Sequence, residues 1–206
     1  MSTINTVIFD IGRVLVDFDY GEYIYNLFDR ETAKTVREAI FGGTFWNEID
    51  RGVLSRDELL AGFTEKAPEY RDEIRIAFDR VGDALAQRPF AIPWIRELKA
   101  AGLRVLYLSN YSHHVMQCNP GVLSFTDYMD GGIFSCNVKL IKPDRRIYER
   151  LIEAYGLTPS ECIFIDDNEA NVEAAAALGI NTIHYKDYEQ AHSELDKLIK
   201  QGAAAK

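Results

Sequence analysis

One short segment near the amino end constrains the fold of this chain more than any other. Residues 4–10 form an apolar run that ends in a carboxylate, Asp10, and Gly12 follows two positions later. Valine, isoleucine and phenylalanine favour a buried strand, so Asp10 is expected at the rim of a core. Ligands of open parallel sheets bind at the carboxyl ends of the strands, and Gly12 permits a tight turn or a close approach. Taken alone, the segment also fits an aspartate that caps a turn after an edge strand.

The overall composition argues against several classes of protein. The 206 residues suffice for one domain with an insertion, or for two small domains. The net charge of −9 argues against a nucleic-acid partner, which requires a basic face. No apolar stretch is long enough to span a bilayer, and we expect no secretory signal. The three cysteines are widely spaced and form no CxxC pair, which indicates a reducing compartment. We expect a cytoplasmic protein without nucleic-acid or membrane partners, as a monomer or a weak dimer.

The spacing of apolar residues divides the chain into two kinds of sequence. Residues 18–87 show helical spacing, with a capping box at Ser55 and Glu58, and no strand is expected there. From residue 88 onward strands and helices alternate, which predicts an α/β protein with a three-layer α/β/α, Rossmann-like parallel sheet. The expected organisation is a core domain of residues 1–17 and 88–206, with a small all-helical cap domain of residues 18–87 inserted after the first strand.

Polar side chains follow the predicted strands or lie in the loops between them. They are Asp10, Ser109, Asn110, Lys142, Asp166 and Asp167. Loops at the carboxyl ends of parallel strands emerge at one edge of the sheet, so these groups can converge. Three carboxylates without histidine or cysteine fit an all-oxygen site for a hard cation such as Mg²⁺. Ser109 and Lys142 suit a phosphate dianion, which leaves Asp10 as a nucleophile that could form an aspartyl-phosphate.

Four segments, in this order, resemble the motifs of the haloacid dehalogenase superfamily. They are Phe9-Asp10-Ile11-Gly12-Arg13-Val14-Leu15, Leu108-Ser109-Asn110, Ile141-Lys142-Pro143-Asp144 and Phe164-Ile165-Asp166-Asp167-Asn168. The resemblance covers nearly the whole chain. It implies that Asp10 is the nucleophile, with Ser109, Asn110 and Lys142 binding the phosphate. It also implies a Mg²⁺ site formed by Asp10, the backbone carbonyl of Gly12, Asp167 and, directly or through water, Asp166.

One position departs from that pattern. Phosphatases of the superfamily usually carry a second aspartate two residues after the nucleophile as general acid and base, and here this position is Gly12. A positioned acid–base group contributes roughly 100- to 10,000-fold in rate. Glycine at this position, with Asp17, Asp19 and the stretch at residues 49–55, resembles the subgroup that contains a bacterial alpha-D-glucose-1-phosphate phosphatase. An anomeric oxygen leaves more easily than an ordinary alkoxide, so the missing acid favours an activated leaving group.

The expected function is Mg²⁺-dependent hydrolysis of a small phosphorylated metabolite, a sugar phosphate such as glucose 1-phosphate. Two alternatives stay open at this point. A 2-haloacid dehalogenase would use the same aspartate to attack carbon and needs no metal, so the paired Asp166 and Asp167 would be superfluous there. A phosphate-binding or regulatory module would have lost turnover together with the acid at Gly12.

Some side chains outside the four motifs have two interpretations. Asp17 either supplies a water-mediated base or, as its position favours, caps the first helix of the cap. His184 and His192 are expected far from the site, in structural roles. Aromatic and charged side chains of the cap either line a sugar pocket or, for the two aromatic ones, form the cap core; they are Phe45, Trp46, Glu48 and Arg51.

Overall fold

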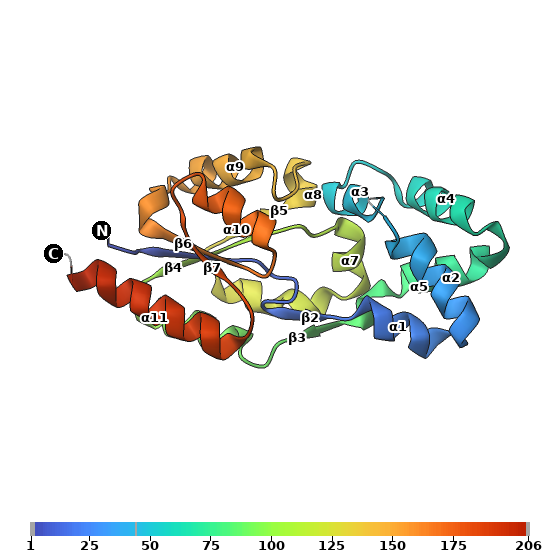
Figure 1. Cartoon of the computed structure of the whole chain (residues 1–206), viewed down its shortest axis with the longest axis horizontal. Helices are drawn as coiled ribbons and strands as arrows, with labels where there is room; N and C mark the ends of the chain where they lie inside the picture. The colour runs from blue at the N-terminus through green and yellow to red at the C-terminus, as the bar shows by residue number, and fades with distance from the viewer. Residues whose placement is uncertain (1–2, 44, 205–206) are drawn as a thin grey trace.

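The computed structural model describes residues 3–43 and 45–204, which form a sheet-containing body at one end and a bundle of helices at the other (Figure 1). Five parallel strands build the sheet in the order β5-β4-β1-β6-β7. The segment around Asp10 therefore supplies the central strand. The strands are β1 (Thr6–Phe9), β4 (Arg104–Ser109), β5 (Gly132–Phe134), β6 (Cys162–Asp166) and β7 (Asn181–His184).

Alternation along the central strand accounts for the layers of the body. Val7 and Phe9 lie in the apolar cluster on one face of the sheet and Ile8 in the cluster on the other, and all three are fully buried. Helices α6 and α11 cover the first face, and α9 and α10 cover the second (Figure 1). The predicted α/β/α class is confirmed. The helices of the body are α6 (Ala91–Ala100), α7 (His113–Cys118), η3 (Pro120–Tyr128), α8 (Ser135–Val138), α9 (Arg145–Tyr155), η4 (Pro159–Glu161), α10 (Glu169–Ala176) and α11 (Tyr188–Ala204).

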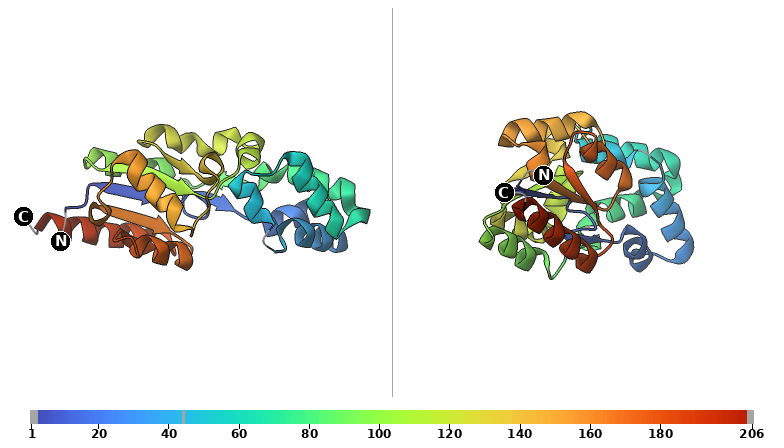
Figure 2. Two further views of the ribbon diagram at one scale, coloured as in Figure 1. Left: turned by 90° about the horizontal axis from the view of Figure 1, so that it is seen from above. Right: turned by 60° about the vertical axis from the view of Figure 1, so that its left-hand side comes forward.

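The helical bundle has an apolar core of its own, built around side chains such as Val36, Phe63 and Phe78. The carboxyl ends of the parallel strands face this bundle, while the end of α11 lies at the far end of the molecule (Figures 1 and 2). The bundle therefore lies over the sheet edge where Asp10 is found. Its helices are α1 (Tyr20–Leu27), α2 (Arg30–Phe41), α3 (Trp46–Arg51), α4 (Arg56–Lys66), η1 (Pro68–Tyr70), α5 (Arg71–Asp79) and η2 (Val81–Ala84).

Two short strands connect the body with the bundle, and the sequence reading missed them. β2 (Val16–Phe18) and β3 (Leu85–Gln87) pair antiparallel, with Asp17 opposite Ala86. The expectation of no strand between residues 18 and 87 was therefore wrong at both ends of that range. Each strand has only three residues, too few for the alternation of buried and exposed side chains to be recognised. The division into domains at residues 17 and 88 stays a prediction.

The described surface has few large apolar side chains. Those that are exposed lie on separate elements or loops, as on ordinary soluble surfaces: Tyr25, Val53, Ile76 and Tyr128. Across residues 3–43 and 45–204, no helix has both the length and the apolar character needed to cross a bilayer. The predicted monomer or weak dimer stays a prediction.

Candidate active site

Three carboxylates meet at the carboxyl edge of the sheet. Asp10 directly follows β1, and Asp166 and Asp167 lie at the end of the neighbouring β6. One oxygen of each carboxylate lies within 4.8 Å of an oxygen of the other two. Asp10 and Asp166 are buried, whereas Asp167 is partly exposed. The structure thus brings Asp10 next to Asp166 and Asp167, which lie more than 150 residues later in the sequence.

Lys142 lies between two of these carboxylates. Its Nζ is 2.8 Å from Oδ1 of Asp10 and 2.6 Å from Oδ2 of Asp166, and its side chain is only 1% exposed. A buried ammonium is tolerated when it is paired and hydrogen-bonded, as it is here. One buried positive charge therefore faces two buried carboxylates, with the third carboxylate beside them.

The shifts in pKa follow from this imbalance. Burial raises the pKa of Asp10 to about 6; the Lys142 ammonium opposes the rise and the Asp166 carboxylate adds to it. Burial disfavours the charge on Lys142, yet the Asp10 and Asp166 carboxylates raise its pKa above the ordinary value. Burial and Asp166 also raise the pKa of Asp167, although the Arg13 guanidinium lies 3.7 Å away and lowers it. A divalent cation would relieve this excess of negative charge.

Ser109 and Asn110 come from the end of β4, on the other side of β1. The Ser109 hydroxyl is buried, and its hydrogen bond with Asp10 lowers the pKa of that carboxyl. Asn110 is bonded twice to the backbone of Lys142: its Nδ2 donates to the carbonyl (3.0 Å), and its Oδ1 accepts from the amide (2.7 Å). Asn110 therefore holds the loop that carries Lys142, and its contact with phosphate stays a prediction.

Asn171 supports the site, although no motif pointed to it. Its buried Nδ2 donates to both carboxylate oxygens of Asp166, at 3.0 and 3.1 Å, and the amide of Asn168 donates to Oδ1 at 2.8 Å. Both oxygens of Asp166 are thus already bonded, one of them also to Lys142. The available signal was an asparagine in the first turn of α10, four residues after the paired aspartates.

We expect Asn171→Ala to destabilise the protein by about 1–3 kcal/mol, because it removes donors from a buried carboxylate. The measurement is the free energy of urea unfolding. Asn26→Ala, at an exposed position of α1, is the matched control and should change stability by less than about 0.5 kcal/mol. Equal stabilities of the two variants would contradict this role of Asn171.

Two of the other sequence interpretations were wrong. Asp19, and not Asp17, caps α1 by accepting a hydrogen bond from the Glu22 amide, whereas Asp17 pairs with Arg88 at 3.3 Å on β2. His184 does not lie far from the site, since its Nε2 is 3.0 Å from the backbone carbonyl of Asp167. The parallel pairing of β6 with β7 brings it there, because Asp166 lies opposite His184 in the register.

A cavity of about 90 Å³ lies between the body and the bundle, beside the loop that follows Asp10. Gly12 contributes to its wall from the body and Trp46 from α3 of the bundle. Its remaining lining is mostly apolar: Val16, Phe18, Tyr20, Leu85 and Val115, with Asp50, Asn110, Tyr111 and Ser112 as the polar members. Of the cap residues considered from sequence, Trp46 lines this cavity. Phe45 packs against Phe63, and Glu48 pairs with Arg51 at 3.3 Å.

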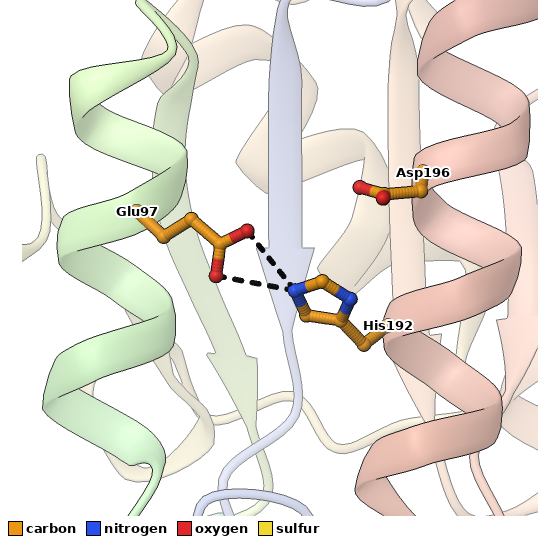
Figure 3. A group of neighbouring side chains, drawn as sticks. All are labelled: Glu97, His192 and Asp196. Carbon is orange, nitrogen blue, oxygen red and sulfur yellow. Dashed lines mark hydrogen bonds and ion pairs between the residues drawn. The ribbon is translucent and has the colours of Figure 1, made fainter.

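A second group of acidic and histidine side chains connects α6 with α11 on the body (Figure 3). His192 Nε2 lies 3.0 and 3.1 Å from the two oxygens of Glu97, and Asp196 lies one turn further along α11. This bond explains the position of His192, which therefore has the structural role expected from sequence. An exposed pair of this kind contributes at most about 1 kcal/mol to stability.

The sequence model of the haloacid dehalogenase-like hydrolases matches residues 4–179. The chain belongs to this family. The match includes Asp10, Lys142 and the paired aspartates after β6, so the residues that converge in the structure all lie within the family region.

Two proteins, one from mouse and one from Aspergillus oryzae, are similar in sequence to this haloacid dehalogenase-like hydrolase. It is 34% identical over 204 residues to mouse acyl-CoA dehydrogenase family member 10, a match that covers 94% of this chain and 19% of that protein. The chain thus spans about a fifth of that relative. It is 25% identical over 198 residues to the sesquiterpene phosphatase astK of Aspergillus oryzae, covering 96% and 98% of the two chains.

Solved structures share the fold. One is a haloacid dehalogenase family enzyme of Bacteroides thetaiotaomicron in complex with magnesium and inorganic phosphate. It superposes with a TM-score of 0.68 and is 23% identical, covering 89% of this chain and 94% of that chain. The likeness confirms a parallel sheet flanked by helices as the fold of this hydrolase.

Proposed function

We propose that this hydrolase is a Mg²⁺-dependent phosphatase that cleaves a small phosphorylated metabolite through an aspartyl-phosphate on Asp10. The observation that carries the proposal is the position of Lys142, held between Asp10 and Asp166 beside the third carboxylate. This arrangement supplies a nucleophile and a positive charge for the transferring oxygens, and a third acidic group that a metal would need. The named phosphatase among the relatives is consistent with it.

The donor set fits Mg²⁺. The nearby acidic oxygens are the hard ligands that this cation prefers, and among the described residues no histidine or cysteine side chain belongs to the cluster. We infer that Asp10, Asp167 and the backbone carbonyl of Gly12 would hold the ion. Asp166 would act through a bound water, because both of its oxygens already accept hydrogen bonds. When bound, Mg²⁺ would neutralise charge on the carboxylates and on the phosphoryl oxygens.

The residues of the chain account for both chemical steps. In the first, a carboxylate oxygen of Asp10 forms a bond to phosphorus, and the leaving oxygen takes the electron pair of the bond that breaks. Lys142 stabilises the negative charge of the transferring group, and Ser109 lies where it can hold an oxygen of that group. In the second, water attacks phosphorus, which releases phosphate and restores the Asp10 carboxylate.

The lining of the cavity supports a proposal for the substrate class, and we propose that residues 18–87 act as a cap that shapes this cavity. A small phosphorylated alcohol fits beside Gly12, and a sugar phosphate such as glucose 1-phosphate could stack its ring on Trp46. The mostly apolar lining favours a second candidate, a phosphorylated alcohol with an apolar body. Direct comparison of the two classes decides between them.

The two other readings make different predictions. A 2-haloacid dehalogenase would release halide from a 2-haloacid without added metal, and the paired Asp166 and Asp167 argue against it. A phosphate-binding module would bind phosphate esters without turnover. The intact set of Asp10, Ser109 and Lys142 argues against that loss of activity.

The test is a screen for phosphate release over sugar phosphates, isoprenyl phosphates and aryl phosphates, with Mg²⁺ or with EDTA. We expect Mg²⁺-dependent release that Asp10→Asn abolishes, because the amide is not a nucleophile. Asp196→Asn changes an equivalent carboxylate in the second cluster (Figure 3) and should leave the rate unaltered. Activity that persists in Asp10→Asn, or halide release without metal, would overturn the proposal.

A further inference from the structure

One acidic residue of the helical bundle, Asp50, is held close to the site by contacts with the body. Asp50 lies on α3, and its backbone carbonyl accepts a hydrogen bond from Ser135 Oγ of α8 at 2.5 Å. Two residues on, Gly52 accepts a hydrogen bond from Lys139. A Cβ at Gly52 would come within 2.9 Å of the Cβ of Cys136, so only glycine allows this contact. The end of α3 is thus anchored on the body.

The Asp50 side chain lines the same cavity as Gly12. Its carboxyl forms no hydrogen bond or ion pair with another side chain in the described ranges 3–43 and 45–204. Burial raises its pKa to about 7; Asp10 adds to the rise and Lys142 opposes it. A carboxyl with this pKa is present in both protonation states near neutral pH, as proton transfer in both directions requires.

The other groups of the cavity are less suited to donate a proton. Tyr111 is buried, and its hydroxyl has no hydrogen-bond partner among the described residues. Burial raises the pKa of Tyr111, and the nearby Asp50 carboxylate raises it further. Burial likewise raises the pKa of Tyr20, with Asp50 contributing. The Ser112 hydroxyl already caps α7 by accepting a hydrogen bond from Val115. Asp50 is the carboxyl among the residues that line the cavity.

We propose that Asp50, supplied by the cap, is the proton donor that takes the place of the acid missing at Gly12. The inference rests on the proposed phosphatase function. While Asp10 forms its bond to phosphorus, the Asp50 O–H proton moves to the leaving oxygen as that oxygen takes the bonding electrons. In the second step the Asp50 carboxylate takes a proton from the attacking water, which returns both residues to their starting forms.

The dependence of rate on the leaving group tests this role. The probes are phenyl phosphate and p-nitrophenyl phosphate, since p-nitrophenolate leaves without a proton and phenolate leaves far less readily. We expect Asp50→Asn to lose roughly 100-fold or more in kcat/KM on phenyl phosphate, with little change on p-nitrophenyl phosphate. A merely structural role would lower both rates alike. Glu48→Gln, two residues earlier on α3 and paired with Arg51, is the matched control and should change neither rate.

A rescue variant makes the test independent of the stability of Asp50→Asn. Among the described residues, no atom beyond the two chain neighbours lies within 4 Å of a Cβ built at Gly12, so the backbone there has room to carry a side chain. Gly12→Asp combined with Asp50→Asn should recover the rate on phenyl phosphate. If Asp50→Asn does not fold, Asp50→Ser provides the same comparison. Equal losses on both esters, or no recovery with Gly12→Asp, would overturn the inference. Absence of wild-type hydrolysis of either ester would instead refute the proposed function on which it rests.

Discussion

Lys142→Met should destabilise the metal-free protein by about 3–5 kcal/mol and reduce phosphatase activity by about 100-fold or more. The variant keeps an unbranched side chain that is one heavy atom shorter, but it removes the ammonium that lies 2.6–2.8 Å from Asp10 and Asp166. Both carboxylates would then remain buried without that partner. The measurements are the free energy of unfolding in EDTA and kcat/KM with Mg²⁺. Saturating Mg²⁺ should restore part of the stability, since a bound cation neutralises the same groups.

The same substitution at the surface provides the control. Lys200 pairs with Asp196 at 3.6 Å, and its side chain is 79% exposed. Lys200→Met should change the free energy of unfolding by less than about 1 kcal/mol, because water screens exposed pairs. If the two variants were equally stable, Lys142 would not compensate the buried carboxylates in the way described.

Asp50→Asn should stabilise the metal-free protein at pH 8 by up to about 4 kcal/mol while having little effect at pH 4. The pKa of Asp50 is raised from 3.8 to about 7, so the folded state holds the proton more tightly than the unfolded state does. Its contribution to stability is therefore lost as the pH rises from about 4 to 7. The asparagine variant has no such loss. The charged or titratable groups that face Asp50 stay in place: Asp10, Lys142, Tyr20, Tyr111 and Cys136.

Thermal or urea unfolding in EDTA at a series of pH values measures this effect. Asp57→Asn replaces a carboxylate whose side chain is 93% exposed, and its stability should follow that of the wild type at every pH. A constant difference between Asp50→Asn and the wild type from pH 4 to 8 would show that Asp50 does not titrate in the raised range. Gain of stability on loss of a functional charge is a common trade-off at active sites.

The central strands could be predicted from sequence because their apolar runs are continuous. β1, β4 and β6 are bordered by polar residues at their carboxyl ends, so Asp10, Ser109 and Asp166 could be placed at one edge of the sheet. Parallel topology then required their loops to converge. Nothing comparable marked β2 and β3, whose pairing depends on a contact between residues about 70 positions apart.

The residues that the sequence reading missed depend on packing that no local pattern encodes. Asp50 reaches the cavity because α3 packs on α8, a contact between the bundle and the body that is made through backbone carbonyls. Asn171 lies outside the four motifs, yet its amide supports Asp166. His184 was placed away from the site because the register between β6 and β7 was unknown. Strand register and helix docking decide the positions of His184 and Asp50, whereas the role of Asn171 depends on how the start of α10 packs against Asp166.

The most direct test of the account is to identify the residue that carries phosphate during turnover. The protein is mixed with Mg²⁺ and p-nitrophenyl phosphate, quenched in acid within the first turnover, and treated with borohydride, which converts an aspartyl-phosphate to homoserine. Peptide mass spectrometry should then find homoserine at position 10, with none in samples without substrate. Homoserine at another aspartate, or rapid turnover with an unmodified Asp10, would contradict the assignment of Asp10 as the nucleophile.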